Sequence, residues 1–282
     1  CSLYALSLPP GTPIWITIVG IVFAVAIAKG AYGGFGRNIF NPAITGRLFI
    51  YITFPTVLAT AWMVPALTDA AQGLTGVFGT SGTANVDAVT AATPLAMRRN
   101  GDMPNLWNLF FGFRAGSMGE SSTFLILLAA GYLLWTKTAN WRLILSTVVT
   151  ALVATVAFYF AGWIPGINPA TYTGAGHLIP IAAYMMSGSI LYVAVFMTTD
   201  PISAPNSNRS QFVYGALIGA ISMTIRTFSG FPEGTSFAIM IGNTFASQLD
   251  EIFPKKKKEK KAAPTKQDKQ QSADNTKQEA KA

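Results

Sequence analysis

The sequence predicts an all-α membrane protein, built as a polytopic bundle of helices. Apolar residues make up 51% of its 282 residues and charged residues only 11%, whereas a soluble globular domain carries about 25% charged residues. Several apolar windows approach the roughly 20 residues that a helix needs to cross a bilayer. The high apolar fraction also excludes disorder for most of the chain.

About seven such windows follow one another, which predicts about seven membrane spans. The first two flank a glycine-rich turn, and the last two contain small or polar residues. Segments interrupted in this way are typical of discontinuous helices that line a pathway, although ordinary helix ends give the same pattern. The windows are Pro13–Ala31, Asn41–Val64, Thr123–Thr136, Leu143–Ile164, Leu178–Thr199, Phe212–Ile225 and Phe237–Leu249.

The windows divide the chain into four regions. Residues 1–64 are expected to form membrane helices around the glycine-rich turn, and residues 121–253 a second set. Residues 65–120 are the one sizeable insertion, and a connection of this length is usually functional or disordered. Residues 254–282 form a low-complexity, Lys-rich tail that predicts disorder. Because the chain starts inside an apolar stretch without Met, we interpret it as truncated.

Loop charge predicts the orientation of the chain in the membrane. The formal net charge is +8, and most of it lies in the tail. Positive loops stay in the cytoplasm, so we expect a cytoplasmic tail and an extracytoplasmic insertion 65–120. Alternation through seven spans then places five loop cations on the tail side: Lys29, Arg37, Lys137, Arg142 and Arg209. The opposite side receives Arg226 and the long insertion with Arg98, Arg99 and Arg114, whose charges weigh less in a segment of that length.

The chain has one Cys and one His, His177. A disulfide within the chain is therefore impossible, and Cys/His metal sites of the usual kind are not expected. We predict no protein-held metal centre.

A run of small residues in the insertion is the first candidate site. It contains Asp87, Thr90 and Thr93 and ends at Pro94. A Thr hydroxyl flanked by Ala leaves space for a bulky adduct. The alternative is a short helix that Asp87 caps and Pro94 stops.

Two further sets of residues lie next to the apolar windows. Gly33 and Gly34 permit positive φ and close approach of a ligand to the backbone, or they form an ordinary tight turn. Acids near membrane segments are costly and therefore functional candidates, which applies to Asp200, Asp250 and Glu233. The alternative roles are a capping position for each acid and, for Glu233, a favourable place near a helix start.

The order of these motifs resembles the NqrB/RnfD family over residues 1 to 253. This family contains the large membrane subunits of the Na⁺-translocating NADH:quinone oxidoreductase and of the Rnf ferredoxin:NAD⁺ complex. The resemblance implies a urea-transporter-like bundle with two inverted repeats and broken helices. Asn38–Ala43 and Asp200–Ala204 would occupy equivalent breaks in the two repeats.

The resemblance also implies roles for individual residues. Thr93 would carry FMN through a phosphoester bond, with Asp87, Thr90 and Ala92 at the other motif positions; Ala88 and Ala91 replace the usual glycines. Riboflavin is a candidate second flavin. The remaining matches are Gly33 and Gly34 for the quinone, if the chain is of the Nqr type, and Asp200, Asp250 and Glu233 for the ion path.

The expected function is that of a membrane flavoprotein subunit of a redox-driven Na⁺ or H⁺ pump in the bacterial inner membrane. Its expected partners are the other subunits of an Nqr or Rnf complex, the lipid bilayer and a flavin transferase, with no nucleic acid. The alternatives are a flavin-free channel or solute transporter of the same fold, and a membrane anchor for a partner complex. The choice between the Nqr and Rnf types stays open.

Overall fold

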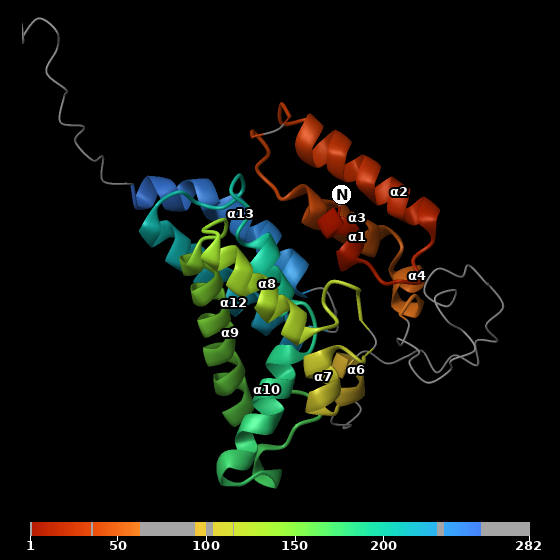
Figure 1. The fold of residues 1–282 in the computed structure, drawn as a ribbon, viewed down its shortest axis with the longest axis vertical. Helices are drawn as coiled ribbons and strands as arrows, with labels where there is room; N and C mark the ends of the chain where they lie inside the picture. Colours follow the sequence, from red (N-terminus) through yellow and green to blue (C-terminus); the bar gives the residue numbers. More distant parts are fainter. Residues whose placement is uncertain are drawn as a thin grey trace, which may run out of the picture.

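The computed structural model describes residues 2–34, 36–62, 94–99, 104–114, 116–229 and 234–254. All regular elements in these ranges are helices, without a strand (Figure 1). The all-α prediction is therefore confirmed for this part of the chain.

The N-terminal part is a small helical unit around its own core. It consists of α1 (Ser2–Ser7), α2 (Ile14–Phe23), the π-helix η1 (Ala24–Gly30), α3 (Pro42–Thr53) and α4 (Pro55–Thr60). Asn41 caps α3 by accepting a hydrogen bond from the Ala43 N–H, and a proline in the first turn suits both α3 and α4. The core of the unit is made of Tyr4, Leu8, Ile16, Ile50, Tyr51 and Leu58.

The second part is a bundle of longer helices: α8 (Thr123–Trp135), α9 (Trp141–Phe160), α12 (Asn208–Phe228) and α13 (Gly234–Ile252). Helix α12 packs against both α9 and α13. Glycines make this packing close, because a Cβ on Gly219 would lie 2.6 Å from the Thr147 carbonyl oxygen of α9. Small residues at such contacts are typical of helices that associate in membranes.

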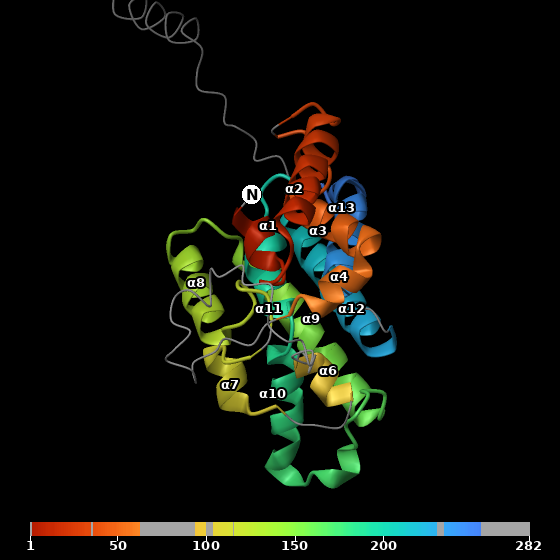
Figure 2. The same cartoon turned by 90° about the vertical axis from the view of Figure 1, so that its right-hand side faces the viewer.

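Broken and short helices make up the rest of the described chain, and α10 lies towards the end of the molecule opposite α2 (Figure 2). A bend of 65° separates α10, together with the 3₁₀ turn before it, from the helical stretch that follows the break. That stretch runs through α11 into the π-helix η4. The broken and short helices are α6 (Pro94–Arg99), α7 (Leu106–Phe111), η2 (Pro169–Thr171), η3 (Gly174–His177), α10 (Leu178–Met186), α11 (Ile190–Tyr192) and η4 (Val193–Met197).

Each apolar window contains helix among its described residues, but the windows that are broken are not the two with small or polar interruptions. The windows Phe212–Ile225 and Phe237–Leu249 were the expected discontinuous segments, and they form continuous helices of 21 and 19 residues. Of the two alternatives, the discontinuous helix therefore does not hold for these windows, and the glycines of α12 serve helix contacts. The windows Asn41–Val64 and Leu178–Thr199 are the broken ones, at Phe54 and at residues 187–189.

The number of spans stays a prediction. Among the described helices, only α9 is long and apolar enough to cross a membrane, or two spans exist if the bent α10–η4 pair counts as one. The helical stretches Ile14–Gly30 and Thr123–Trp135 are apolar but shorter.

The two parts of the chain show the same order of elements around the predicted breaks. The π-helix η1 is followed by a turn that leads into α3, and the π-helix η4 is followed by a turn that leads into α12.

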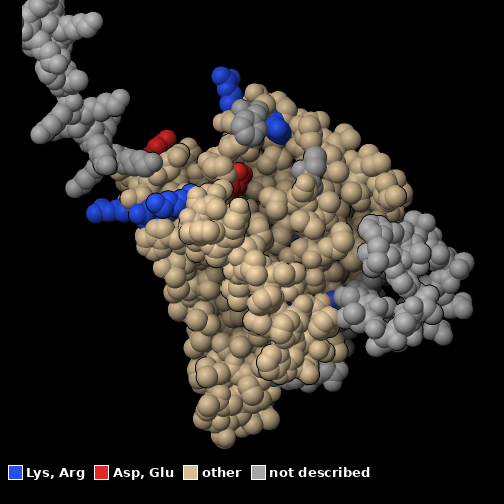
Figure 3. Space-filling view, in the orientation of Figure 1, with Lys and Arg blue, Asp and Glu red and all other residues tan. Residues whose placement is uncertain are grey.

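The turn after η1 and helix α13 lie towards the same end of the molecule, where most of the charged side chains in view gather (Figure 3). Residues 161–177, at the other end, contain no Lys, Arg, Asp or Glu. This distribution agrees with the predicted orientation, while the inverted relation of the repeats stays a prediction.

Candidate functional site

The flavin motif cannot be placed in this structure. Asp87, Thr90, Ala92 and Thr93 lie outside the described residues, as does Glu233. The description resumes at Pro94, which is buried at the start of α6.

Gly33 and Gly34 form the turn that ends the π-helix η1. Their φ angles are +98° and +92°, which L-residues with side chains rarely adopt. The Gly33 N–H donates to Gly30 O and the Gly34 N–H to Lys29 O, and a Cβ on Gly34 would meet nothing within 4 Å. The turn therefore requires these glycines, and it leaves open space beside Gly34.

Asp200 lies in the turn before α12, and Asp250 of α13 contacts the end of the same turn. The Asp200 carboxylate accepts a hydrogen bond from Ser203 Oγ at 2.7 Å. The Asp250 carboxylate accepts from the N–H groups of Asn206 and Ser207 at 2.7 and 2.9 Å. The structure thus brings both acids to one turn, and Asp250 ties the end of α13 to the start of α12.

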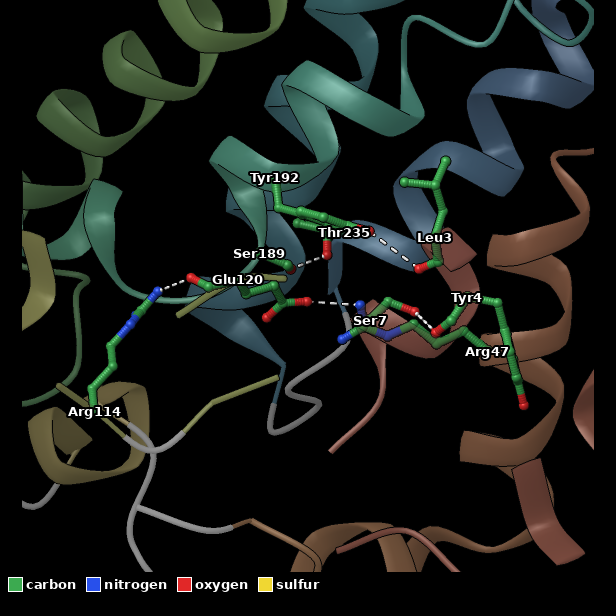
Figure 4. A network of polar contacts seen from close by, with 9 residues as sticks. All are labelled: Leu3, Tyr4, Ser7, Arg47, Arg114, Glu120, Ser189, Tyr192 and Thr235. Atoms are coloured by element: carbon green, nitrogen blue, oxygen red, sulfur yellow. Dashed lines mark hydrogen bonds and ion pairs between the residues drawn. The ribbon is translucent and has the colours of Figure 1, made fainter. Parts of the chain in front are cut away.

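A buried cluster of charged side chains lies where the two parts of the molecule meet (Figure 4). Arg47 of α3 and Glu120 form an ion pair with an Nη1–Oε1 distance of 2.7 Å, and their side chains are 2% and 7% exposed. Arg114 and Arg226 are also buried. Of these four residues, sequence reasoning had selected only Glu120, as a candidate to line the flavin or ion route.

Arg114 holds the chain segment that carries Glu120. Its guanidinium donates from Nε to Ser121 O at 2.9 Å and from Nη2 to Glu120 O. Arg114 lies in the insertion, outside the predicted membrane windows, and burial lowers the pKa of its guanidinium to about 10, while Glu120 opposes that shift. The group therefore stays protonated at neutral pH.

Arg226 of α12 donates hydrogen bonds to carbonyl groups at the end of α10. Its Nη1 donates to Tyr184 O at 3.2 Å and to Ser187 O at 2.9 Å. The last carbonyl groups of a helix lack partners within the helix and attract cations. Arg226 therefore stabilises the break between α10 and α11.

Several hydroxyl groups belong to the same part of the molecule as Glu120 (Figure 4). Ser189 and Thr235 are hydrogen-bonded to each other, and Tyr192 donates to Leu3 O at 3.1 Å. Ser117, whose carbonyl accepts from the Glu120 N–H, is fully buried, and its Oγ has no hydrogen-bond partner among the described residues. A carboxylate among hydroxyls can exchange a proton or bind a hard cation through oxygen.

A repeated pattern in the sequence is the signal that could have found this cluster. Thr-x-Arg-x-Phe occurs at residues 45–49 and again at residues 224–228. Glu-x-Ser/Thr-Ser/Thr-Phe occurs at residues 120–124 and at residues 233–237. Arg47, Arg226 and Glu120 all belong to these repeated patterns.

Comparison with known proteins decides the family. Residues 1–259 match the NQR2, RnfD, RnfE family. The chain belongs to this family. The resemblance that the motifs indicated is thereby confirmed.

Subunits from two kinds of complex, an NADH-quinone reductase and an ion-translocating oxidoreductase complex, are similarly close in sequence to this chain. It is 35% identical over 254 residues to the B subunit of the Na(+)-translocating NADH-quinone reductase of Chromohalobacter salexigens, with 89% of this chain and 56% of the relative covered. It is 35% identical over 271 residues to the D subunit of the ion-translocating oxidoreductase complex of Escherichia coli, with 88% and 73% covered. The D subunit of the same complex from Halorhodospira halophila is 33% identical over 262 residues, with 87% and 70% covered. The chain thus spans about half the length of the first relative.

Proposed function

We propose that the chain is a flavin-carrying membrane subunit of a bacterial redox-driven ion pump. In this role it relays electrons through FMN on Thr93, and the complex couples their flow to the movement of Na⁺ or H⁺. The observation that carries the proposal is the family match together with the Asp87–Thr93 motif. The names of its relatives, subunits of ion-translocating oxidoreductases, support a place in a multi-subunit complex.

The exposed apolar surface supports a position in the bilayer. Large apolar side chains are exposed along three helices, α2, α8 and α9, and in water a patch of this extent would be a liability. Examples are Ile14, Trp15, Leu125, Leu128, Trp135, Val153 and Phe160.

The residues near the flavin motif suit the group. A phosphoester needs a hydroxyl, which Thr93 supplies, with Asp87, Thr90 and Ala92 at the other motif positions. On α7, within the same insertion, Trp107 is 69% exposed and stacked on Phe111 at an interplanar angle of 9°. Flat aromatic faces of this kind suit an isoalloxazine ring. When bound, FMN supplies the electron chemistry, while the protein supplies position and electrostatics.

The other roles complete the proposal. Gly33 and Gly34 line a quinone site if the complex is of the Nqr type. Asp200, Asp250 and Glu233 serve the ion path. Riboflavin is a candidate second flavin, a flavin transferase attaches FMN, and the Lys-rich tail faces the cytoplasm.

Covalent flavin on a denaturing gel tests the proposal. The chain, co-expressed with a flavin transferase, should give a fluorescent band under ultraviolet light after denaturation. Thr93→Ala should lose the band, and the control Thr173→Ala, an exposed Thr in the loop before η3, should keep it. A wild-type band without fluorescence would contradict the proposal and favour a flavin-free channel or transporter.

A further inference from the structure

We propose that the starts of α9 and α12, together with the turn between α8 and α9, bind the headgroup of an anionic phospholipid. The residues that would hold its phosphate are Lys137, Arg142 and Arg209. The inference rests on the position in the bilayer that the proposed function implies, and it adds a lipid ligand that the flavin and the ion path do not need.

Helices α9 and α12 begin next to each other. They pack side by side (Figure 1), and their contacts follow the same order along both chains. A Cβ on Gly215 would lie 3.0 Å from Leu143 O. One turn further on, a Cβ on Gly219 would lie 2.6 Å from Thr147 O. The two helices therefore run in the same direction, with their first turns at one level.

Three cations gather at this level. Arg142 and Arg209 lie in the first turns of α9 and α12, and Lys137 lies in the turn between α8 and α9. None of the three forms an ion pair within the part of the chain that the structure describes. The Arg142 guanidinium carbon lies 5.1 Å from the ring centroid of Trp141. That ring contacts the Phe212 ring of α12, with centroids 6.0 Å apart, so cations from two helices share one surface.

The acid that contacts this surface is Asp250 of α13. Its carboxylate accepts hydrogen bonds from the N–H groups of Asn206 and Ser207 at the start of α12. Even when the neighbouring Glu251 is counted, three cations exceed two acids. The surface therefore keeps an excess of positive charge, which attracts an anionic ligand.

Each of the two arginines stands at the start of an exposed apolar stripe. The exposed apolar residues that follow at helical spacing are Leu145, Val149 and Leu152 on α9, and Phe212 and Val213 on α12. From Arg142 to Leu152 the helix rises about 15 Å, which is half of the roughly 30 Å thickness of the hydrocarbon core. A cation followed by an apolar stripe of this length matches a phospholipid, with its phosphate at the cation and an acyl chain along the helix. A free phosphate would use only the first part of this surface.

Two tryptophans place the surface at the depth of lipid headgroups. Trp135 is 80% exposed and Trp141 is 50% exposed, on either side of the turn between α8 and α9. Tryptophan is enriched where the membrane meets water. The orientation predicted from loop charge puts Lys137, Arg142 and Arg209 on the cytoplasmic side, where anionic lipids attract basic residues.

Photochemical labelling of the assembled complex tests the proposal. The complex is reconstituted in vesicles of phosphatidylethanolamine that contain a photoreactive phosphatidylglycerol, and labelled peptides are identified by mass spectrometry after irradiation. We expect adducts on the turn between α8 and α9 and on the first turns of α9 and α12. A photoreactive phosphatidylethanolamine in a parallel sample should label these peptides much less.

Charge variants show whether the cations cause the labelling. Replacement of Lys137, Arg142 and Arg209 by Gln, singly and together, should weaken labelling by phosphatidylglycerol about fivefold for each charge removed. Arg37→Gln is the matched control, because Arg37 is an exposed cation in the turn after η1, and it should leave labelling of α9 and α12 unchanged. In the wild type, added NaCl should weaken the labelling, since salt screens exposed charges; this measurement decides if the triple variant does not assemble.

Three results would overturn the proposal. Equal labelling by the two lipids would mean ordinary contact with the bilayer. Displacement of phosphatidylglycerol by inorganic phosphate would mean a site for a free anion. An absence of adducts in the assembled complex would mean that another subunit covers the surface. The labelling needs neither flavin nor electron transfer, so a complex that does not pump would contradict the proposed function and leave this test intact.

Discussion

Gly188 and Arg226 depend on each other at the break after α10. Gly188 has a φ of +79°, and a Cβ there would lie 2.9 Å from Arg226 Nη2. Glycine therefore does two things at this position: it adopts the left-handed backbone and it leaves room for the guanidinium. The guanidinium in turn satisfies Tyr184 O and Ser187 O.

A pair of glycine variants separates these two effects. Gly162 has a φ of +71°, and a Cβ there would meet nothing within 4 Å. We expect Gly162→Ala to cost about 1–2 kcal/mol, from the backbone alone. Gly188→Ala should cost a further ~1–3 kcal/mol because the methyl group displaces Arg226. Thermal unfolding of the purified protein in detergent measures both, and equal losses would contradict the role of the Arg226 contact.

Sequence reasoning predicted the local turn at Gly33 and Gly34 and missed the long-range ion pair between Arg47 and Glu120. The glycine-rich pattern around Gly33 and Gly34 correctly predicted a backbone turn, because a glycine pair has a direct conformational meaning. The Arg47–Glu120 pair joins residues 73 positions apart. No local pattern states which acid an arginine will meet across such a distance, although the repeated Thr-x-Arg-x-Phe motif marks the residue.

At the scale of the helices, apolar windows correctly predicted where helices lie, while glycine and polar residues within the windows did not predict where helices break. Apolar windows correspond to helices because backbone groups buried from water must bond within their own segment. Glycines in α12 indicated a break but serve contact with α9, where Gly215 and Gly219 lie against Ser146 and Thr147. The true break after α10 depends on Arg226 from another helix, which composition cannot indicate.

The packing of α12 on α9 yields a prediction for Gly219. A Cβ at Gly219 would lie 2.6 Å from Thr147 O and 3.0 Å from Ala151 N. Because these are backbone atoms, the two helices would have to move apart to make room for it. Gly219→Ala should therefore destabilise the protein by ~1–3 kcal/mol. Gly131→Ala on α8, where a Cβ meets nothing within 4 Å, should be neutral or stabilising by up to about 1 kcal/mol. A thermal midpoint of Gly219→Ala at or above that of the wild type would refute this account of the interface.

At the scale of the whole molecule, the charged end and the buried cluster belong to one arrangement. Exposed charges gather at the end predicted to face the cytoplasm (Figure 3). Arg47, Arg114 and Glu120 are buried where the N-terminal unit meets the rest of the molecule (Figure 4), and Arg226 is buried at the break after α10. The scarcity of charge, which first indicated a membrane protein, also makes each of these buried residues an informative target.

Redox-driven ion uptake tests the central proposal most directly. Inverted membrane vesicles that contain the assembled complex are supplied with the electron donor, and Na⁺ and H⁺ uptake are followed for the wild type and for Thr93→Ala at equal amounts of chain in the membrane. We predict uptake in the wild type and its loss in Thr93→Ala, because in the proposed function FMN on Thr93 relays the electrons that drive the pump. Equal uptake in the two proteins would contradict this account and reduce the chain to a membrane anchor.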